Sequence, residues 1–507
     1  MHDKRFNKIW NNIIAVLIIG LSFLWTGSAF LSWVYNVAAL LEPVGRIDLL
    51  EILTEGVGYV FQAVGILTFS IFIRHYLIST RVVHSADILL KATFLTASLT
   101  DVMLTYVCMN TASLQTALIF GYIQNILHGI IAAMYIYILT LYVEIGRRGI
   151  VFGVGYSIGS IGSYIISRLN SDNFLRDIRC IPIYITITVI TIILIYTCVF
   201  TEASAVYKIF TGKTDAPENP ASEGDVSSVA IQIIVLATAV VFLLSVVKGL
   251  GFYFDFSDVW VDGMSLEYTR LYYAVGLLLA GIINDLNRRW GGILCVAALV
   301  FPFVLILLNS TSVSGKILWI INYSITGLYV VYRVLLFSDI AWESLLYKPL
   351  SKGKSLLFIA PFGLMIGRLG DFVSTLIGIR LSSLPVILNA ITAIIFVITV
   401  IMFSALFTSL YLGEIAKNNN KYYTRISSDN SLSDDTDTSI GFSDYYKLTD
   451  REMLVLYHIT NRLTNKEIAA ELFVQESTVK YHVKNILRKT NCSNRKELLA
   501  LYEGYKH

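Results

Sequence analysis

A run of basic and polar residues near the C-terminus has the spacing of one helix face. Residues 464–490, TNKEIAAELFVQESTVKYHVKNILRKT, place apolar side chains at helical intervals, which predicts helices with one buried side. On the last of these helices, the residues expected to form the buried stripe are Val479, Val483, Ile486 and Leu487. The outward-facing positions are Thr478, Lys480, Tyr481, Lys484, Asn485 and Arg488. The lysines and the arginine can donate charged hydrogen bonds to an anion in water.

The same region carries repeated signals for the start of a helix. A Thr or Asn stands three residues before a Glu at Thr449–Glu452, Thr464–Glu467 and Asn494–Glu497. In such a capping box each side chain accepts a hydrogen bond from the backbone N–H of the other residue. Residues 447–507 are therefore expected to form a domain of four short helices around a small apolar core.

Two helices joined by a tight turn, the second with an exposed basic face, form the helix-turn-helix arrangement, in which the second helix enters the DNA major groove. Residues 447–507 resemble the LuxR-type DNA-binding domain over their whole length, with the elements N-K-E-I-A, T-V-K-x-H-V and I-L-x-K. The resemblance implies binding to double-stranded DNA. It also implies dimerisation through the fourth helix, around Arg495 to Tyr502, and hence a homodimer on DNA.

The resemblance assigns a role to individual positions of this chain. Base edges would be read by Lys480, Tyr481 and Lys484. Phosphates would be contacted by Lys466, Thr478 and Arg488. Lysine and arginine can bond either guanine or phosphate, so the sequence leaves the contact of each basic residue open. A basic helix that only faces solvent is the alternative interpretation.

Two positions depart from the family pattern. Gln475 stands where the family usually caps the recognition helix with Ser, which weakens the cap. Tyr481 stands where a smaller residue is common, so the DNA sequence that is read is expected to differ. His482 is expected to pack beside the buried stripe rather than to read a base.

The part of the chain that precedes this C-terminal domain is largely apolar. Of the 507 residues, 55% are hydrophobic and 15% charged, which indicates a membrane protein. Apolar runs long enough to cross roughly 30 Å of hydrocarbon as helices recur before position 412. The predicted spans are 12–35, 54–77, 86–108, 114–141, 149–167, 180–200, 229–254, 266–285, 291–308, 316–337, 355–378 and 385–411. The first is expected to be retained rather than cleaved as a signal peptide.

A long polar interruption after the sixth span divides the chain into two sets of six. The predicted layout is a first membrane half at 1–201, a central loop at 202–228, a second half at 229–412, a flexible acidic linker at 413–446 and the C-terminal domain at 447–507. The linker has three Lys/Arg against six Asp/Glu, whereas the domain has eleven against seven. The predicted fold is therefore all-α, a transmembrane bundle of twelve helices plus a four-helix tail.

The positions of lysine and arginine predict the orientation in the membrane. Basic residues of short loops concentrate on the side that holds the N-terminus, which places both termini in the cytoplasm. One loop, with Arg168, Arg176 and Arg179, runs against this rule, and Asp172 and Asp177 offset it in part. A multi-pass protein of the inner, cytoplasmic membrane is expected.

The six-plus-six layout resembles the major facilitator superfamily, whose halves are related repeats. That family carries a G-x-x-x-D-R-x-G-R-R-like signature in the second-to-third loop of each half. In GIINDLNRRWGG the matching positions are Gly281, Asp285 and Arg289, while Leu286 and Arg288 depart from it. The first-half counterpart has lost the signature. An Asp and an Arg at a helix end can join neighbouring helices through orphan backbone groups.

Ionisable groups inside apolar spans are costly and are candidates for function. Segment 245–260 holds the most ionisable and aromatic residues, and its Tyr253 is added to these candidates. The candidate ligand-binding residues are Asp101, Lys248, Tyr253, Asp255, Arg270 and Arg333. Arg368 and Asp371 are three residues apart and are expected to pair with each other. His128 is expected to be a packing residue.

Other chemistries are not indicated. The five cysteines are scattered without C-x-x-C spacing, so the sequence predicts no disulfide and no zinc or other metal site. It also predicts no cofactor and no enzymatic activity. The expected function is a membrane-integrated, one-component transcription regulator that senses a small molecule, with aromatic compounds suggested by Phe252, Tyr253, Tyr272 and Tyr273. The alternatives are a working transporter that also regulates, and a regulator whose spans are only an anchor. The lipid bilayer is the remaining partner.

Overall fold

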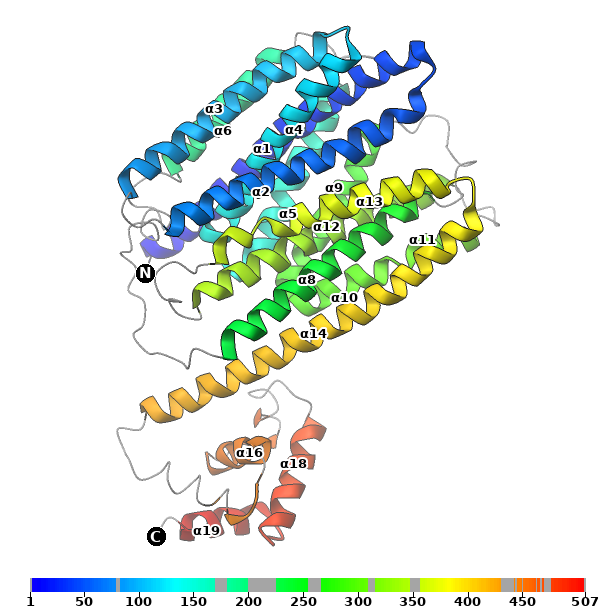
Figure 1. The fold of residues 1–507 in the computed structure, drawn as a ribbon. Coiled ribbons are helices and arrows are strands. Elements are labelled where there is room, and N and C mark those ends of the chain that lie inside the picture. The colour runs from blue at the N-terminus through cyan, green and yellow to red at the C-terminus, as the bar shows by residue number, and fades with distance from the viewer. Residues whose placement is uncertain are drawn as a thin grey trace. The chain divides into compact units, whose positions relative to one another are not determined.

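The computed structural model describes residues 2–78, 83–168, 180–198, 225–253, 266–308, 315–346 and 356–429, and from 442 to 505 all but 443, 444, 449, 462, 466 and 469–475. The described elements are helices and short helical turns, which confirms the all-α prediction for this part of the chain. The chain divides into two compact units, Met1–Ser409 and Leu410–His507. Figure 1 shows the ribbon, and each unit is described by itself below.

Within the described residues, each predicted membrane span falls on helical structure, and the ninth is divided between two helices. The helices of the first half are α1 (His2–Leu41), α2 (Val57–Ile78), α3 (Val83–Asn110), α4 (Leu114–Tyr142), α5 (Arg148–Arg168) and α6 (Cys180–Cys198). Those of the second half are α8 (Asp225–Leu250), α9 (Leu266–Leu286), α10 (Arg288–Ala298), α11 (Phe301–Leu308), α12 (Gly315–Leu346), α13 (Phe362–Leu381) and α14 (Pro385–Asp429). Among the described residues, eight helical segments are long and apolar enough to cross a membrane.

The ninth predicted span is the one that the structure breaks. It consists of α10 and α11, which are separated at Leu299 and Val300. Pro302 explains the break, because proline has no backbone N–H to donate and its ring clashes with the carbonyl one turn earlier. Short helical turns precede other helices at Glu42–Val44, Ile47–Leu49, Ile52–Gly56, Ile145–Arg147 and Leu356–Ile359, and Gly251–Tyr253 follows α8.

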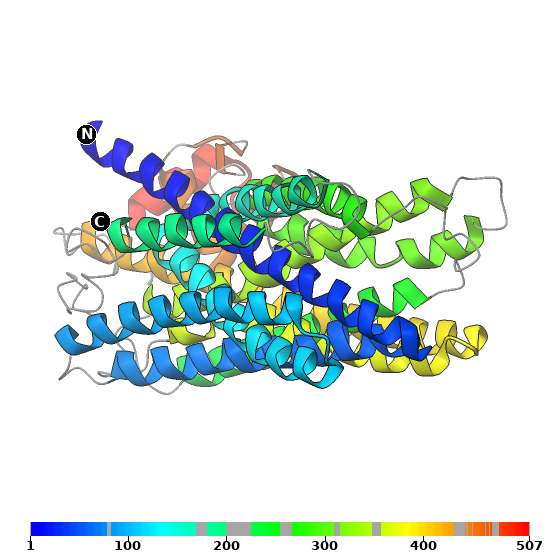
Figure 2. The ribbon, with the colours of Figure 1, turned by 90° about the horizontal axis from the view of Figure 1, so that it is seen from above.

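Helix packing repeats from one half of the membrane unit to the other. The first and fifth helices of the first half, α1 and α5, are in contact, and so are their counterparts α8 and α13. The second and fourth, α2 and α4, are in contact, as are α9 and α12. Between the halves, α5 packs on α9 and α2 packs on α13, and exchanging the halves converts one pair into the other. The contacts thus support two related halves, which lie alongside each other with α1 crossing obliquely (Figures 1 and 2).

The last long helix extends into the segment predicted as a flexible linker. Helix α14 continues from Pro385 to Asp429, past the predicted boundary at residue 412. Beyond Gly413 the sequence EIAKNNNKYYTRISSD contains neither proline nor glycine, so nothing in it stops a helix that has already begun. The helical conformation therefore covers the first half of the predicted linker.

The C-terminal unit is a small helical domain with its own core. Its described helices are α16 (Asp450–Thr460), α18 (Glu476–Lys489) and α19 (Arg495–Tyr505). The buried core residues are Phe442, Val455, Leu456, Ile459, Ile468, Val479, Ile486, Leu498 and Tyr502. Phe442 is 0% exposed and its ring meets those of Tyr446, Tyr502 and Tyr505, so the core begins before the predicted domain boundary at residue 447.

Candidate functional site

Helix α18 presents one apolar and one basic side, as its sequence predicts. Val479 and Ile486 are fully buried, and Val483 and Leu487 pack against the same core. The side chains of Lys480, Tyr481, Lys484 and Arg488 are exposed. Tyr481 is 62% exposed, and its ring meets the half-buried ring of His482 edge-on. The basic face therefore stands on a rigid apolar base and is open to an anion.

Polar contacts fix α18 and α19 against the rest of the domain. The Lys489 ammonium, at the end of α18, donates to the Glu452 carboxylate of α16 at 2.6 Å and to the carbonyl of Lys447 at 2.8 Å. The Arg495 guanidinium, at the start of α19, donates to the carbonyl of Leu463 at 2.6 Å. Partial burial lowers the pKa of the Arg495 guanidinium from its usual value. These contacts hold the basic face in one orientation.

Of the two capping boxes whose residues the structure describes, the Thr464–Glu467 box is complete and the Asn494–Glu497 box is formed on one side only. The N–H of Thr464 donates to the Glu467 carboxylate at 2.7 Å, and the N–H of Glu467 donates to the Thr464 hydroxyl at 3.3 Å. At α19 the N–H of Glu497 donates to Asn494 at 3.0 Å, whereas its carboxylate accepts from the N–H and hydroxyl of Ser493. These hydrogen bonds stabilise both charged carboxylates and lower the pKa of Glu467 and of Glu497.

Some predicted residues of this region cannot be placed. Lys466, Thr449 and Gln475 lie outside the described residues, and Thr478 lies in α18 without a described side chain. The DNA-binding roles of all six named residues stay a prediction.

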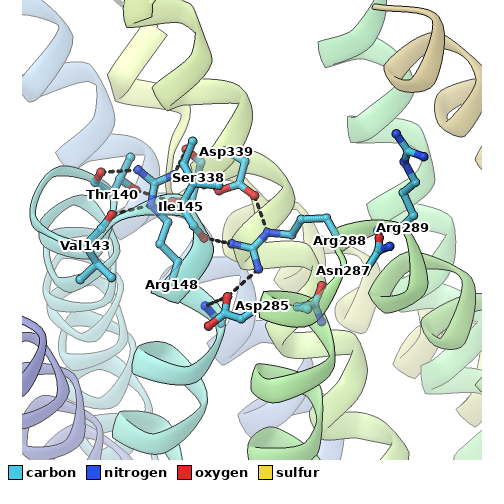
Figure 3. A network of polar contacts seen from close by, with 12 residues as sticks. Thr140, Val143, Ile145, Arg148, Asp285, Asn287, Arg288, Arg289, Ser338 and Asp339 are labelled. Carbon is cyan, nitrogen blue, oxygen red and sulfur yellow. Dashed lines mark hydrogen bonds and ion pairs between the residues drawn. The ribbon is translucent and has the colours of Figure 1, made fainter. Parts of the chain in front are cut away.

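A network of polar contacts joins the two membrane halves at one end of the bundle (Figure 3). Arg148 begins α5 and is fully buried. Its guanidinium donates to the carbonyls of Thr140 and Val143 in the first half, at 2.7 and 3.0 Å. It also donates to the Asp339 carboxylate of α12 in the second half, at 2.9 Å. Because every branch of this arginine is occupied, removing it strands several buried acceptors.

Asp285, from the predicted loop signature, caps α5 across the same boundary. Its carboxylate accepts hydrogen bonds from the N–H groups of Gly149 and Ile150, at 2.8 and 2.6 Å. A carboxylate at this position satisfies orphan donors and faces the positive end of the helix dipole. Gly281 lets the two backbones approach, because a Cβ there would lie 2.6 Å from the carbonyl oxygen of Gly149.

The arginine whose guanidinium joins this network is Arg288, at a position that departs from the predicted signature. The Arg288 guanidinium donates to Asp285 and to Asp339, each at 2.8 Å, and to the carbonyl of Ile145. The Arg289 side chain is exposed and points away from the network (Figure 3). Matching the family pattern position by position favoured Arg289, whereas the helix start at Asn287 directs Arg288 back toward Asp285.

A second group of charges lies inside the membrane unit. The Asp371 carboxylate of α13 accepts from the Lys248 ammonium of α8 at 2.8 Å and from the Ser245 hydroxyl at 2.7 Å. The Arg333 guanidinium of α12 lies 3.7 Å from the other carboxylate oxygen. The expected partner Arg368 instead lies over the ring of Tyr59, 4.1 Å from its centroid. The predicted Arg368–Asp371 pair is therefore replaced by a Lys248–Asp371–Arg333 cluster that the linear sequence does not reveal.

The remaining candidates are scattered. Asp101 and His128 are buried with Nε2 and Oδ1 3.0 Å apart, but without the alignment of a hydrogen bond. The Tyr253 hydroxyl donates to Glu51 of the first half. The Arg270 guanidinium reaches the carbonyl of Gly27 at 3.5 Å. Asp255 lies outside the described residues. Within the described part of the chain, no group of three or more His, Cys, Asp or Glu residues could hold a metal ion.

Residues 446–502 match the model of the family described as bacterial regulatory proteins, luxR family. The C-terminal unit contains a LuxR-type helix-turn-helix domain. The LuxR-type domain is 53% identical over 55 residues to a nitrate/nitrite response regulator protein homolog of Haemophilus influenzae, covering 11% of this chain and 26% of that protein. It is 44% identical over 55 residues to nitrate/nitrite response regulator protein NarP of Escherichia coli, covering the same shares. The chain thus spans about a quarter of the length of these relatives.

The structure of the human organic anion transporter MFSD10 (TETRAN) matches 79% of this chain and 99% of that one, with 14% identity and a TM-score of 0.48. At that score the likeness does not by itself establish a shared fold. The repeat of helix contacts between the halves is the independent observation for a six-plus-six arrangement.

Proposed function

We propose that this chain is a membrane-integrated, one-component transcription regulator. The observation that carries the proposal is the LuxR-type domain with α18 held on a buried core and its basic face exposed. Lys480, Tyr481 and Lys484 are proposed to contact base edges. Phosphates are proposed to be contacted by Lys466, Thr478 and Arg488. Two copies of the chain are proposed to bind one operator, since a twofold DNA site matches a dimer.

The membrane unit is proposed to be the input. Each end of the boundary between the halves carries specific contacts, Asp285 with α5 at one end and Tyr253 with Glu51 at the other. Contacts of this kind can be made or broken when the halves tilt, so two arrangements can differ by only a few kcal/mol. A ligand that prefers one arrangement by such an amount shifts the population substantially.

The proposed topology places the unit in the inner, cytoplasmic membrane with both termini in the cytoplasm, so that the LuxR-type domain reaches DNA. The lysine and arginine bias of the loops supports this orientation. Placing a protease outside sealed spheroplasts tests it, because the LuxR-type domain should resist cleavage until the membrane is opened. Cleavage of this domain in sealed spheroplasts would contradict the orientation.

A working transporter with an attached regulatory domain is the second candidate. The buried Lys248–Asp371–Arg333 cluster favours it equally, because charged groups inside a membrane unit also mark transport pathways. Uptake into proteoliposomes separates the two functions: a ligand that binds without net flux identifies a receptor, and net flux identifies a transporter.

The DNA-binding proposal is tested with the full chain in lipid nanodiscs. Selection from a random double-stranded library should enrich a sequence with twofold symmetry, and raising the salt concentration should weaken its binding steeply. The double variant Lys480→Ala, Lys484→Ala is the test variant and should lose the enrichment. Equal enrichment by the double variant would refute the assignment of α18 as the recognition helix.

A further inference from the structure

The membrane unit holds more positive than negative charge at the boundary between its halves. Among the described residues the cations are Lys248, Arg270, Arg333 and Arg368, and the carboxylates at this boundary are Glu51, Glu55 and Asp371. Even with all three carboxylates ionised, four positive charges against three negative ones leave one positive charge. Burying unpaired charge in apolar surroundings is expensive, so this excess calls for an anion from elsewhere.

Asp371 is already used by its neighbours. One carboxylate oxygen accepts from Lys248 and Ser245, and the other faces Arg333 at 3.7 Å. Within the described residues, no carboxylate lies within 4.0 Å of the guanidinium of Arg270 or Arg368. Arg270 contacts the Gly27 carbonyl, and Arg368 lies over the Tyr59 ring. The two guanidinium groups therefore keep their capacity to pair with an oxyanion.

The arginines face the same group of tyrosines from different helices. Tyr59 of α2 and Tyr156 of α5 are within electrostatic range of both Arg270 and Arg368. Tyr273 of α9 is within range of Arg333 and Arg368, and its ring meets that of Tyr156 edge-on. The cations belong to the second half, whereas Tyr59 and Tyr156 belong to the first. An anion bound here would contact both halves.

The donor groups suit an oxyanion on a flat molecule. The buried Nε atoms of Arg333 and Arg368 have no hydrogen-bond partner, and Arg333 is only 2% exposed. A guanidinium fork matches the two oxygens of a carboxylate or the oxygens of a phosphate. The Tyr156 ring is already stacked on Phe23 and Phe152, and Arg368 lies over the Tyr59 ring. The Tyr273 ring meets Tyr156 only edge-on, so its face is the one on which an aromatic ring can stack.

We propose that the ligand of the membrane unit is a small aromatic oxyanion, most simply an aromatic carboxylate, held by Arg270, Arg333 and Arg368 between the two halves. This proposal rests on the proposed function, since it specifies the ligand class of the sensing unit. The negative group supplies the charge that the cluster lacks. Because it pulls cations of one half toward tyrosines of the other, its binding favours one arrangement of the halves.

The test measures ligand binding by the purified full chain in nanodiscs, through thermal unfolding and isothermal calorimetry. The probes are benzoate, phenylphosphonate, the neutral isostere benzamide and the ring-free anion acetate. Benzoate or phenylphosphonate should bind roughly tenfold or more tightly than benzamide, because neutral benzamide cannot accept the charge-assisted hydrogen bonds that the arginines donate to an anion. The tighter of the two identifies a carboxylate or a phosphate-like group, and weaker binding of acetate confirms the aromatic contribution.

The variant Arg368→Gln separates a binding role from a structural one. It should abolish the preference for the anions while leaving the unliganded melting temperature unchanged or raised, since it removes one of several clustered cations. Arg46→Gln, at an exposed arginine paired with Asp48, is the matched control and should bind like the wild type. A lowered melting temperature with anion preference retained would overturn the proposal.

The outcomes also distinguish this proposal from the proposed function. Benzamide binding as tightly as benzoate would overturn the ligand class. So would the absence of any effect of either aromatic anion at about 10 mM, a concentration that would fill even a weak site with a Kd of about 1 mM. If an aromatic anion binds but operator affinity is unchanged in its presence, the ligand class stands and the sensing function fails. If a neutral solute changes operator affinity, the sensing function stands and the ligand class fails.

Discussion

The two units of this chain use charge in opposite ways. In the LuxR-type domain, Lys480, Lys484 and Arg488 lie outside, on a helix whose other side fills the core. In the membrane unit, Arg148 and Arg333 lie inside, where each depends on partners from other helices. An exposed charge keeps its hydration until a ligand arrives, whereas a buried one must be compensated by other groups of the fold or by a bound ligand.

This difference decides how far each unit can be interpreted. The outward charges of α18 contribute little to folding, so their pattern reports on what they bind. The buried charges contribute to folding, to function or to both, and only their partners tell which. Arg148 has all its partners and is structural, whereas Arg368 has a tyrosine ring and no described carboxylate, which suits a binding role.

The largest effect is expected in the core that supports the basic face. Replacing Phe442 with Ala should destabilise the LuxR-type domain by about 3 to 5 kcal/mol, because a fully buried aromatic ring leaves a cavity. Hydrogen exchange of the amides of α16, α18 and α19 in the full chain measures the loss. Tyr445→Ala is the control at a 70% exposed neighbour and should cost less than about 1 kcal/mol. Equal protection in both variants would place Phe442 outside the core.

Adjacent arginines in the membrane unit give the next comparison. Arg148→Ala should cost about 3 to 5 kcal/mol, because three buried carbonyls lose their donor and Asp339 keeps only its contact with Arg288. Arg147→Ala removes the same charge from an exposed position and should change stability by less than about 0.5 kcal/mol. Thermal unfolding in detergent compares them. Similar melting temperatures for the two variants would show that the network does not stabilise the bundle.

A smaller effect is expected on the exposed face of α18. Lys484→Ala should weaken binding to the selected operator by about 1 to 3 kcal/mol if its ammonium contacts a base. Lys496→Ala removes the same charge from an exposed position of α19 and should cost less than about 0.5 kcal/mol, because salt screens distant charges. Fluorescence anisotropy at one fixed salt concentration measures both. Equal losses would mean that only total charge matters.

The smallest effect concerns the caps of the LuxR-type domain. The pKa of Glu467 and of Glu497 is lowered in the folded chain, so their contribution is complete above the ordinary Glu pKa of about 4.3 and is lost as the pH falls through the lowered value. The first turn of α19 should therefore lose hydrogen-exchange protection below about pH 4. Glu497→Gln should remove that pH dependence at α19, and an unchanged acid response would exclude Glu497 as its source.

The sequence predicts the regular elements well because their determinants are local. Apolar run length predicts the positions of the membrane helices, and Pro302, visible in the sequence, accounts for the break in the ninth. Helical spacing predicts the buried stripe of α18 from Val479 to Leu487. The same local logic underestimates α14, because polar composition in 413–429 indicates a linker although no residue there ends the helix.

Partners that lie far apart along the chain could not be predicted from spacing. Lys248 and Asp371 meet because α8 packs on α13, and the nearer Arg368 is turned toward Tyr59 instead. Arg288 was missed because the family pattern places its arginine at the neighbouring position. The sequence did carry a signal for Arg288, because this arginine directly follows Asn287, which caps the start of α10.

The central claim is that the membrane unit governs the LuxR-type domain. Its most direct test is operator affinity of the full chain in nanodiscs before and after Asp285→Asn, which weakens the cap that joins α9 to α5. If the two arrangements of the halves are coupled to DNA binding, affinity should change about fivefold or more, with Arg147→Ala as an inert control. An operator affinity identical to that of the wild type, in a variant whose membrane unit melts at a shifted temperature, would contradict the coupling.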